Sequence, residues 1–413
     1  MRKSILFLAL VSFLAGACCS NGSEKTIEKF NLIAKDVKKA YAPDSRDETF
    51  NVNIEKDEDG ELNINGYTTV PAAKDSLILA LKANNIDADI NIEIIPDAEE
   101  LEGKAYAVAA QSVINFRNEG DYAAEAATQC LMGAPLKVLK NDGGWTLAIT
   151  PEGYHAWVSS STIARMTAEE FAKYTAADKV VLTVKYADIK EAPDASSQQV
   201  CDAVWGDVML DLGRSGNWWK VGIADGREGY LPASVLVTFP DWVASRKPTP
   251  ENIIATAKTM IGVPYMWAAT SVKAMDCSGF TKNVYYLNGI VLRRDASQQC
   301  KTGDDIDVTK YSVDSVYTRE ALANLQMGDL IFFGRNRDRI SHVGMYIGDG
   351  IFIHEAGKVH ISSLIPEDEN YYTGSKRLQR ACRIIGNVDC GKNIWSVNEL
   401  YTKNPAIWGE YEN

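Results

Sequence analysis

The stretch MDCSGF at residues 275–280 places a cysteine between an aspartate and a Ser-Gly pair. An apolar stripe at i, i+4 and i+7 begins at Phe280, so Cys277 is predicted to open the first turn of a helix that Asp276 can cap. The dipole and the unpaired N–H groups at a helix N-terminus favour a thiolate over a thiol. This position therefore suits a nucleophile, which also needs a nearby base.

Histidine is the natural base, and three of the four histidines in the chain, His342, His354 and His360, fall within nineteen residues. The segments around them alternate like three strands, with turns at 349–350 and 356–358. His342 and His354 flank the first turn and could be cross-strand neighbours. A base whose tautomer is held by a second polar ring is what triad chemistry requires. His360 is interpreted as an ordinary strand or surface histidine.

Two β-rich copies precede this region. Residues 104–168 and 178–238 each contain an opening strand, a variable loop, a Gly before an alternating strand, a turn and a strand that starts with Trp145 or Trp218. Such a repeat predicts two small β-barrels. The arrangement resembles the bacterial SH3 (SH3b) domains of cell-wall enzymes, and the first copy matches that pattern better. Ahead of them, residues 26–103 alternate helical and strand spacing and predict a small α+β module of unknown role.

Residues 248–388 closely resemble the NlpC/p60 family of papain-like cysteine peptidases. The resemblance implies a compact α+β fold in which Cys277 is the nucleophile, His342 the general base and His354 the residue that orients it. It also implies that Tyr265 lies close to the thiolate. The matching motifs are GVPYMWAATSVKAMDCSGF, RRDASQQ, QMGDLIFFG, SHVGMYIGDG and FIHEAG.

One departure from the family pattern precedes the nucleophile. Relatives commonly have Gly-Gly after the Trp of this motif, whereas this chain has Ala268 and Ala269. Because both residues are still small, we expect a slightly altered loop and retained activity.

The resemblance implies cleavage of cell-wall peptides between γ-D-Glu and a diamino acid, in a subgroup that requires a free L-Ala amine. An ammonium group must be met by carboxylates and hydrogen-bond acceptors. Asp276, Ser278 and Asp295 are the candidates near the thiol, and Glu119 and Tyr154 are those of the first SH3b domain. Plainer interpretations stay open, because Asp295 could simply cap a helix and Glu119 could be a solvated loop charge.

Composition excludes some other functions. The 413 residues are 46% hydrophobic and 24% charged, which is ordinary for a globular protein, and the formal net charge is −12. Because phosphate contacts need clustered Lys and Arg, nucleic acid is an improbable partner. The sequence has no metal-ligand spacing and implies no cofactor. The six cysteines after residue 19 have no framework spacing, so buried free thiols are expected. Pairing of some of them stays open for an exported protein, and Cys382 and Cys390 are the closest in sequence.

The N-terminus predicts export. Two positive charges precede an apolar run that is too short to span a bilayer, so residues 1–17 are predicted to be a signal peptide. LAGAC resembles a lipobox with Cys18 as the lipid attachment site, although plain cleavage after Ala17 also fits. We expect a monomer in the periplasm or cell envelope, anchored by lipid. A wall-binding protein without activity and a related thiol amidase on another substrate are the alternative functions.

Overall fold

A computed structural model describes residues 22–308 and 317–402, which fall into two compact units that meet at residues 94 and 95. The predicted signal peptide and Cys18 lie outside the described residues. None of the described helices is both long and apolar enough to cross a membrane.

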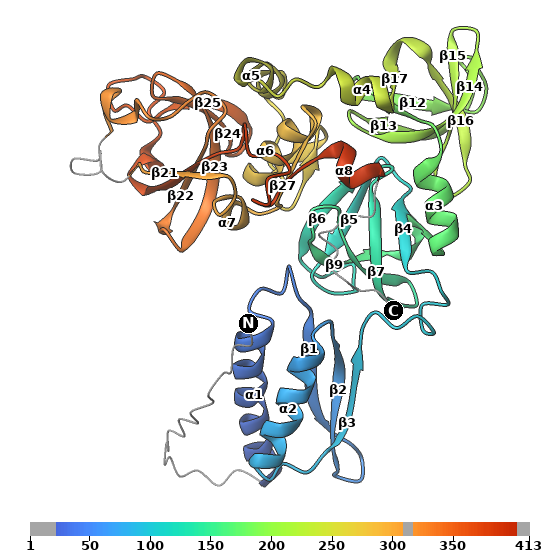
Figure 1. Cartoon of the computed structure of the whole chain (residues 1–413), viewed down its shortest axis with the longest axis vertical. Coiled ribbons are helices and arrows are strands. Elements are labelled where there is room, and N and C mark those ends of the chain that lie inside the picture. Colours follow the sequence, from blue (N-terminus) through green and yellow to red (C-terminus); the bar gives the residue numbers. More distant parts are fainter. Residues whose placement is uncertain (1–21, 309–316, 403–413) are drawn as a thin grey trace. The chain divides into compact units, whose positions relative to one another are not determined.

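The first unit is a three-stranded sheet with two helices (Figure 1). β1 pairs antiparallel with β2, and β2 pairs parallel with β3 across the connection that contains α2. Apolar residues of α1 at helical spacing, Phe30, Ile33 and Val37, pack with Leu77 and Leu81 of α2 into the core of this unit. The elements are α1 (Gly22–Tyr41), β1 (Phe50–Lys56), β2 (Leu62–Thr68), α2 (Pro71–Ala83) and β3 (Asp89–Ile94).

The second unit begins with two seven-stranded barrels. The first has the strand order β10-β4-β7-β8-β9-β5-β6, and the second has β13-β12-β16-β15-β14-β11-β17. When the second order is read from β17 to β13, each strand takes the position of the first-barrel strand whose number is lower by seven. The two sheets therefore have the same topology, which confirms the predicted repeat. The strands of the first barrel are β4 (Tyr106–Ala109), β5 (Val113–Arg117), β6 (Ala126–Leu131), β7 (Pro135–Asp142), β8 (Trp145–Ile149), β9 (His155–Ser159) and β10 (Ile163–Met166).

The second barrel is joined to the first through α3 (Ala168–Ala176), whose N-terminus is closed by a capping box between Thr167 and Glu170. The buried Asp207 accepts hydrogen bonds from the backbone N–H groups of Met132 and Val204. The strands of the second barrel are β11 (Lys179–Leu182), β12 (Tyr186–Lys190), β13 (Gln199–Val204), β14 (Val208–Ser215), β15 (Trp218–Gly222), β16 (Glu228–Pro232) and β17 (Leu236–Thr238). The 3₁₀ helices η1 (Ser160–Thr162) and η2 (Ala233–Val235) precede the last strands of the two barrels.

The rest of the second unit is built on a six-stranded antiparallel sheet, β21-β26-β22-β23-β24-β25. Its strands are β21 (Asp304–Ile306), β22 (Leu330–Asn336), β23 (Arg339–Gly348), β24 (Ile351–Glu355), β25 (Val359–Ser363) and β26 (Leu378–Arg383). The three predicted strands around the histidines are confirmed as β23, β24 and β25. Asp349 and Gly350 both have positive φ in the turn between β23 and β24, as a two-residue hairpin turn requires.

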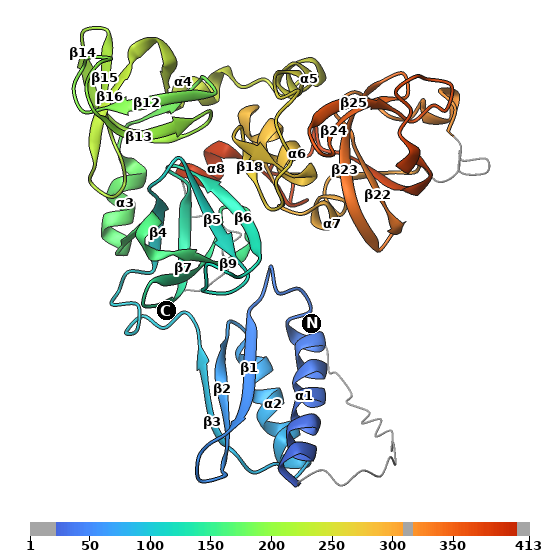
Figure 2. The same ribbon diagram turned by 180° about the vertical axis from the view of Figure 1, so that it is seen from behind.

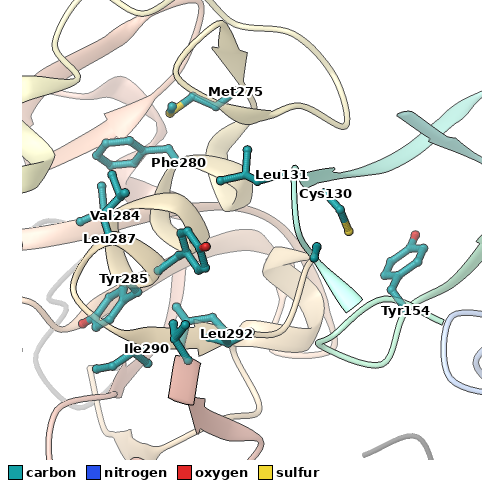
Figure 3. Close-up of a cluster of buried hydrophobic side chains, with 14 of the residues drawn as sticks. Cys130, Leu131, Tyr154, Met275, Phe280, Val284, Tyr285, Leu287, Ile290 and Leu292 are labelled. Carbon is teal, nitrogen blue, oxygen red and sulfur yellow. The ribbon is translucent and has the colours of Figure 1, made fainter. Parts of the chain in front are cut away.

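Helix α6 (Cys277–Leu287) packs against β23 and β24 (Figures 1 and 2). Its predicted apolar stripe is buried: Phe280 and Val284 are 0% exposed and Leu287 is 1% exposed. Figure 3 shows this stripe below Met275, with Leu131 and Cys130 of the first barrel to its right. The preceding elements are α4 (Phe239–Ser245), α5 (Pro250–Thr259), β18 (Thr270–Ser271) and β19 (Ala274–Met275).

The chain after residue 388 also contributes to this region. β27 (Ile394–Ser396) pairs antiparallel with β20 (Ile290–Leu292), the strand that follows α6. α8 (Val397–Thr402) then places Tyr401 against Phe239 and Tyr286. The remaining elements are α7 (Ala296–Gln299), η4 (Glu320–Leu322) and η5 (Thr373–Arg377). Together, the barrels and the mixed α+β region confirm the predicted fold class.

Candidate active site

Cys277 is the first residue of α6, as predicted, and 9% of its surface is exposed. Asp276 is the N-cap, and its Oδ1 accepts a hydrogen bond of 2.7 Å from the Gly279 backbone N–H. A side chain at Gly279 would place its Cβ 2.0 Å from the carbonyl oxygen of Ala269. A glycine at position 279 is therefore needed to let the preceding loop close over the helix start.

A buried ion pair fixes this helix start. Arg294 is 1% exposed and forms a two-pronged contact with Asp276: Nη2 lies 2.6 Å from Oδ2 and Nη1 lies 3.1 Å from Oδ1. Arg294 also donates to Ser278 Oγ at 2.8 Å and to Thr128 Oγ1 of the first barrel at 3.0 Å. Burial lowers the pKa of Arg294, but the charge and hydrogen bonds of Asp276 raise it by more, so the net shift is upward. Arg294 is therefore a permanent cation beside the thiol.

The departure from Gly-Gly causes backbone strain at Ala268. Its φ is +66°, in the left-handed region that favours glycine, and its N–H donates to Asp276 Oδ2 at 2.9 Å. The loop keeps the conformation that a glycine would adopt, and the alanine is strained in it. Ala269, by contrast, is not among the residues with positive φ.

The two histidines meet as neighbours in β23 and β24. His342 Nε2 lies 2.8 Å from His354 Nδ1, and His354 Nε2 lies 3.1 Å from Ser362 Oγ. For His342 to accept a proton on Nδ1, its Nε2–H must donate to His354 Nδ1. His354 Nε2–H then donates to Ser362, so the serine fixes the tautomer of the whole chain of bonds.

The thiol lies against the strand that carries His342. The backbone N–H of Val343, the next residue, forms a hydrogen bond that lowers the pKa of Cys277. Since His342 Nε2 faces His354, Nδ1 is the nitrogen that can serve the thiol. The structure thus brings Cys277, His342 and His354 into one site.

The charge state of the resting site differs from the prediction. Burial, together with the negative charge of Asp276, raises the pKa of Cys277 to about 12. Burial and the neighbouring His360 lower the pKa of His342 to about 4, and burial lowers that of His354 to about 2. Both shifts oppose the expected thiolate, because the loss of solvation outweighs the effect of the helix N-terminus. They favour a neutral thiol and a neutral imidazole.

Aromatic rings enclose the histidine pair. Tyr372 meets His354 edge-on with ring centroids 5.0 Å apart, and its centroid lies 6.1 Å from that of His342. Phe352 lies 4.6 Å from His354 by the same measure. Tyr265 is 40% exposed, and burial and the charge of Cys277 raise its pKa to about 12. Tyr265 therefore lies near the thiol, as the resemblance implies.

The first barrel borders the site through β6. Gln129 Oε1 accepts a 2.8 Å hydrogen bond from the Thr270 N–H, and the Ala126 carbonyl accepts one of 3.1 Å from Trp267 Nε1. Tyr154 is 7% exposed and acts electrostatically on Arg294, which places it beside the ion pair. Glu119 lies in the exposed turn between β5 and β6.

The other predicted substrate contacts occupy structural positions. Asp276 and Ser278 are both engaged by Arg294, and Asp276 also holds two backbone N–H groups. Asp295 is the N-cap residue of α7 and its side chain is 30% exposed. Of the three, Asp295 presents the most surface, and a role in substrate binding stays a prediction for each of them.

Sequence reasoning missed four residues of the site. Arg294 stands in the RRDASQQ motif, but nothing there pointed to Asp276 as its partner. Ser362 lies two residues after His360, the cross-strand partner of His354, so alternation along β25 could have placed it beside the pair. For Tyr372 and Glu355, no sequence pattern beyond the residue type indicated a place in the site. Among the described residues, no cluster of ligands for a metal ion occurs, and the six cysteines there are free.

Comparison with known proteins identifies the two parts of this site. Residues 262–378 match the NlpC/P60 family. This segment is an NlpC/P60 domain. Residues 116–163 match the bacterial dipeptidyl-peptidase Sh3 domain. The chain is thus a cysteine peptidase of the NlpC/P60 type with a bacterial SH3 domain.

Curated relatives match over both parts. A γ-D-glutamyl-L-lysine dipeptidyl-peptidase of Bacillus cereus is 28% identical over 60% of this chain and 74% of its own length. Dipeptidyl-peptidase 6 of Lysinibacillus sphaericus is 24% identical over 68% of this chain and 99% of its own. The crystal structure of an NlpC/P60 family protein from Bacillus cereus has a TM-score of 0.56 at 23% identity, covering 67% of this chain and 99% of that one. That last likeness supports the fold.

Proposed function

We propose that the protein hydrolyses the amide bond between γ-D-Glu and a diamino acid in peptidoglycan stem peptides that carry a free N-terminal L-Ala. The observation that carries the proposal is the hydrogen-bonded pair of His342 and His354 beside the thiol of Cys277. The names of the two dipeptidyl-peptidase relatives support the substrate class.

Catalysis starts from the neutral thiol and imidazole. His342 Nδ1 takes the thiol proton as the sulfur of Cys277 attacks the γ-carbonyl carbon, and the C–S bond forms. The Cys277 backbone N–H, at the start of α6, and Tyr265 stabilise the negative charge on the carbonyl oxygen. His354 stabilises the imidazolium through the 2.8 Å bond to His342 Nε2.

The tetrahedral intermediate then collapses. The C–N bond breaks, His342 gives its proton to the departing amine, and a thioester remains on Cys277. His342 next removes a proton from water, whose oxygen bonds to the thioester carbon. The C–S bond then breaks, the sulfur takes the proton back from His342, and the dipeptide acid leaves.

Recognition of the free amine is assigned to the edge between the two domains. Asp295 and Glu119 supply negative charge and Tyr154 an acceptor for the L-Ala ammonium group. Asp276 and Ser278 contribute by holding Arg294, which balances that negative charge near the thiol.

Export is part of the proposal, since cell-wall hydrolases act outside the cytoplasm. Residues 1–17 serve as the signal peptide and Cys18 carries the lipid. We further propose a monomer with the boundaries given above: 26–103, 104–168, 178–238 and 248–388. Replacement of Cys18 by Ala should release the protein from the membrane fraction without changing its activity, and retention of the C18A variant there would refute the lipid anchor.

The test of function is mass spectrometry of products from L-Ala-γ-D-Glu-meso-diaminopimelate and its N-acetylated form. We expect L-Ala-γ-D-Glu and free diaminopimelate from the first peptide and no product from the second. Equal cleavage of both would favour a broad thiol amidase. Binding to wall sacculi without any released peptide would favour a wall-binding protein.

A further inference from the structure

Glu355 places its carboxyl group in the buried wall of the active site, with no hydrogen-bond donor beside it among the described residues. Its residue is 0% exposed, and neither carboxylate oxygen has a hydrogen-bond partner among the described residues. Burial of an ionised carboxylate without donors costs several kcal/mol or more, so such a group is normally uncharged. Glu355 is the residue directly after His354 and is absent from the reaction scheme above.

The alternation of β24 shows which way Glu355 points. Phe352 and His354 contact each other on one face of the strand, so Ile353 and Glu355 lie on the other. Ile353 and Val359, the partner of Glu355 across the ladder, belong to the buried core that includes Cys277. Since α6 packs against β24, the carboxyl group lies between the sheet and the helix that begins with the nucleophile.

The charged and titratable groups on that side are few. Asp276 and Cys277 come from the start of α6, and the cation Arg294 is bound to Asp276. Tyr265 comes from the loop before α6, and its backbone N–H donates to the Gly357 carbonyl. Ionised Cys277 and ionised Glu355 both raise the pKa of Tyr265, so both lie within electrostatic reach of one phenol. On the strands, the residues that share the face of Glu355 are apolar, as with Ile353 and Val359.

We propose that Glu355 is a further residue of the active site that must be an uncharged carboxylic acid for the nucleophile to form. The inference rests on the proposed reaction. When Glu355 ionises, its negative charge joins that of Asp276 beside the thiol. It then opposes both the thiolate and the negative charge that develops on the carbonyl oxygen. Burial, followed by the charge of Asp276, raises the pKa of Glu355 to about 7, so this change falls in the neutral range.

The first test is the rate at which iodoacetamide alkylates Cys277 between pH 5.5 and 8.5, read by peptide mass spectrometry so that other cysteines do not contribute. Glu355→Gln keeps the shape and removes the ionisation. We expect a ratio of variant to wild-type rates near one at pH 5.5. The ratio should rise about tenfold by pH 8.5, the effect of a one-unit change in the thiol pKa. Glu251→Gln, an exposed residue of α5, is the matched control and should give a flat ratio.

If the ratio of alkylation rates for Glu355→Gln does not vary with pH, the inference is overturned. A purely structural role of Glu355 would change the rate equally at every pH. Alkylation needs no substrate, so this outcome is separate from failure of the proposed function, which would show as absent peptide cleavage. Should the variant not fold, NMR of wild-type protein with ¹³C-labelled glutamate carboxyls decides the matter. A resonance titrating near pH 7, assigned to Glu355, supports the inference, and titration of Glu355 at the ordinary glutamate pKa refutes it.

Discussion

Replacement of Arg294 by Met tests the buried ion pair at the start of α6. The change removes the contacts of 2.6 Å and 3.1 Å to Asp276, a residue that is 5% exposed in the structure. Removing one partner of a buried pair costs about 3–5 kcal/mol. Asp276 keeps the N–H groups of Ala268 and Gly279, which still solvate part of its charge. We therefore expect the lower end, a loss of about 3 kcal/mol in the free energy of unfolding.

Replacement of Arg294 should also lower the catalytic rate. The positive charge of Arg294 lowers the pKa of Cys277 while Asp276 raises it, so the variant leaves only the unfavourable charge. A further rise of one unit in the thiol pKa corresponds to about tenfold in thiolate population. kcat/KM for the tripeptide should fall by about tenfold or more.

Urea denaturation followed by tryptophan fluorescence measures the first effect. All nine tryptophans lie after residue 95, so the signal reports the second unit alone. Arg335→Met, an exposed arginine of β22, is the matched control and should change stability by less than about 0.5 kcal/mol. The double change Asp276→Asn with Arg294→Met should recover part of the loss.

The account of the ion pair fails if the free energy of unfolding of Arg294→Met lies within about 0.5 kcal/mol of the wild-type value. It also fails if the double variant is no more stable than Arg294→Met, since the cost would then not come from a stranded carboxylate.

Four further predictions follow from single contacts. Ala268→Gly should stabilise the protein by about 0.5–1 kcal/mol in the same denaturation assay, whereas Ala269→Gly should destabilise it by about 1 kcal/mol; equal effects would refute the strain. Gly279→Ala should cost about 3 kcal/mol or prevent folding, and a soluble, fully active variant would contradict the close approach to Ala269. Because His342 must be unprotonated to act as a base and its pKa is lowered to about 4, kcat/KM should hold down to that pH and fall below it; a fall near pH 6.5 would be inconsistent. Ser362→Ala should lower kcat about fivefold, the value of one hydrogen bond, with KM unchanged, and an unaltered kcat would remove the serine from the site.

The parts of the site that the sequence could predict depend on local spacing. The position of Cys277 at the first turn of α6 follows from the apolar stripe behind it, and the hairpin that carries His342 and His354 follows from alternation around a DG turn. The two barrels could be predicted because the repeat appears in the chain itself.

The parts that could not be predicted depend on tertiary packing. The pKa of Cys277 is set by burial under a loop and against β23, and helix position alone predicts the opposite direction. The partner of Asp276 is 18 residues away, and Thr128 on the first barrel is 166 residues from Arg294. The strain at Ala268 depends on a φ that residue type does not reveal, and Glu355 matters only because the structure gives it no donor.

The central claim is that His342 activates the sulfur of Cys277 to form a covalent acyl-enzyme. Intact-protein mass spectrometry after rapid acid quench of the enzyme with L-Ala-γ-D-Glu-meso-diaminopimelate tests it most directly. The account predicts an added L-Ala-γ-D-Glu acyl group on Cys277 in the wild type. It predicts no adduct and no cleavage for Cys277→Ala, and a strongly reduced rate of adduct formation for His342→Ala. Cleavage by Cys277→Ala at the wild-type rate, or an adduct on another residue, would contradict it.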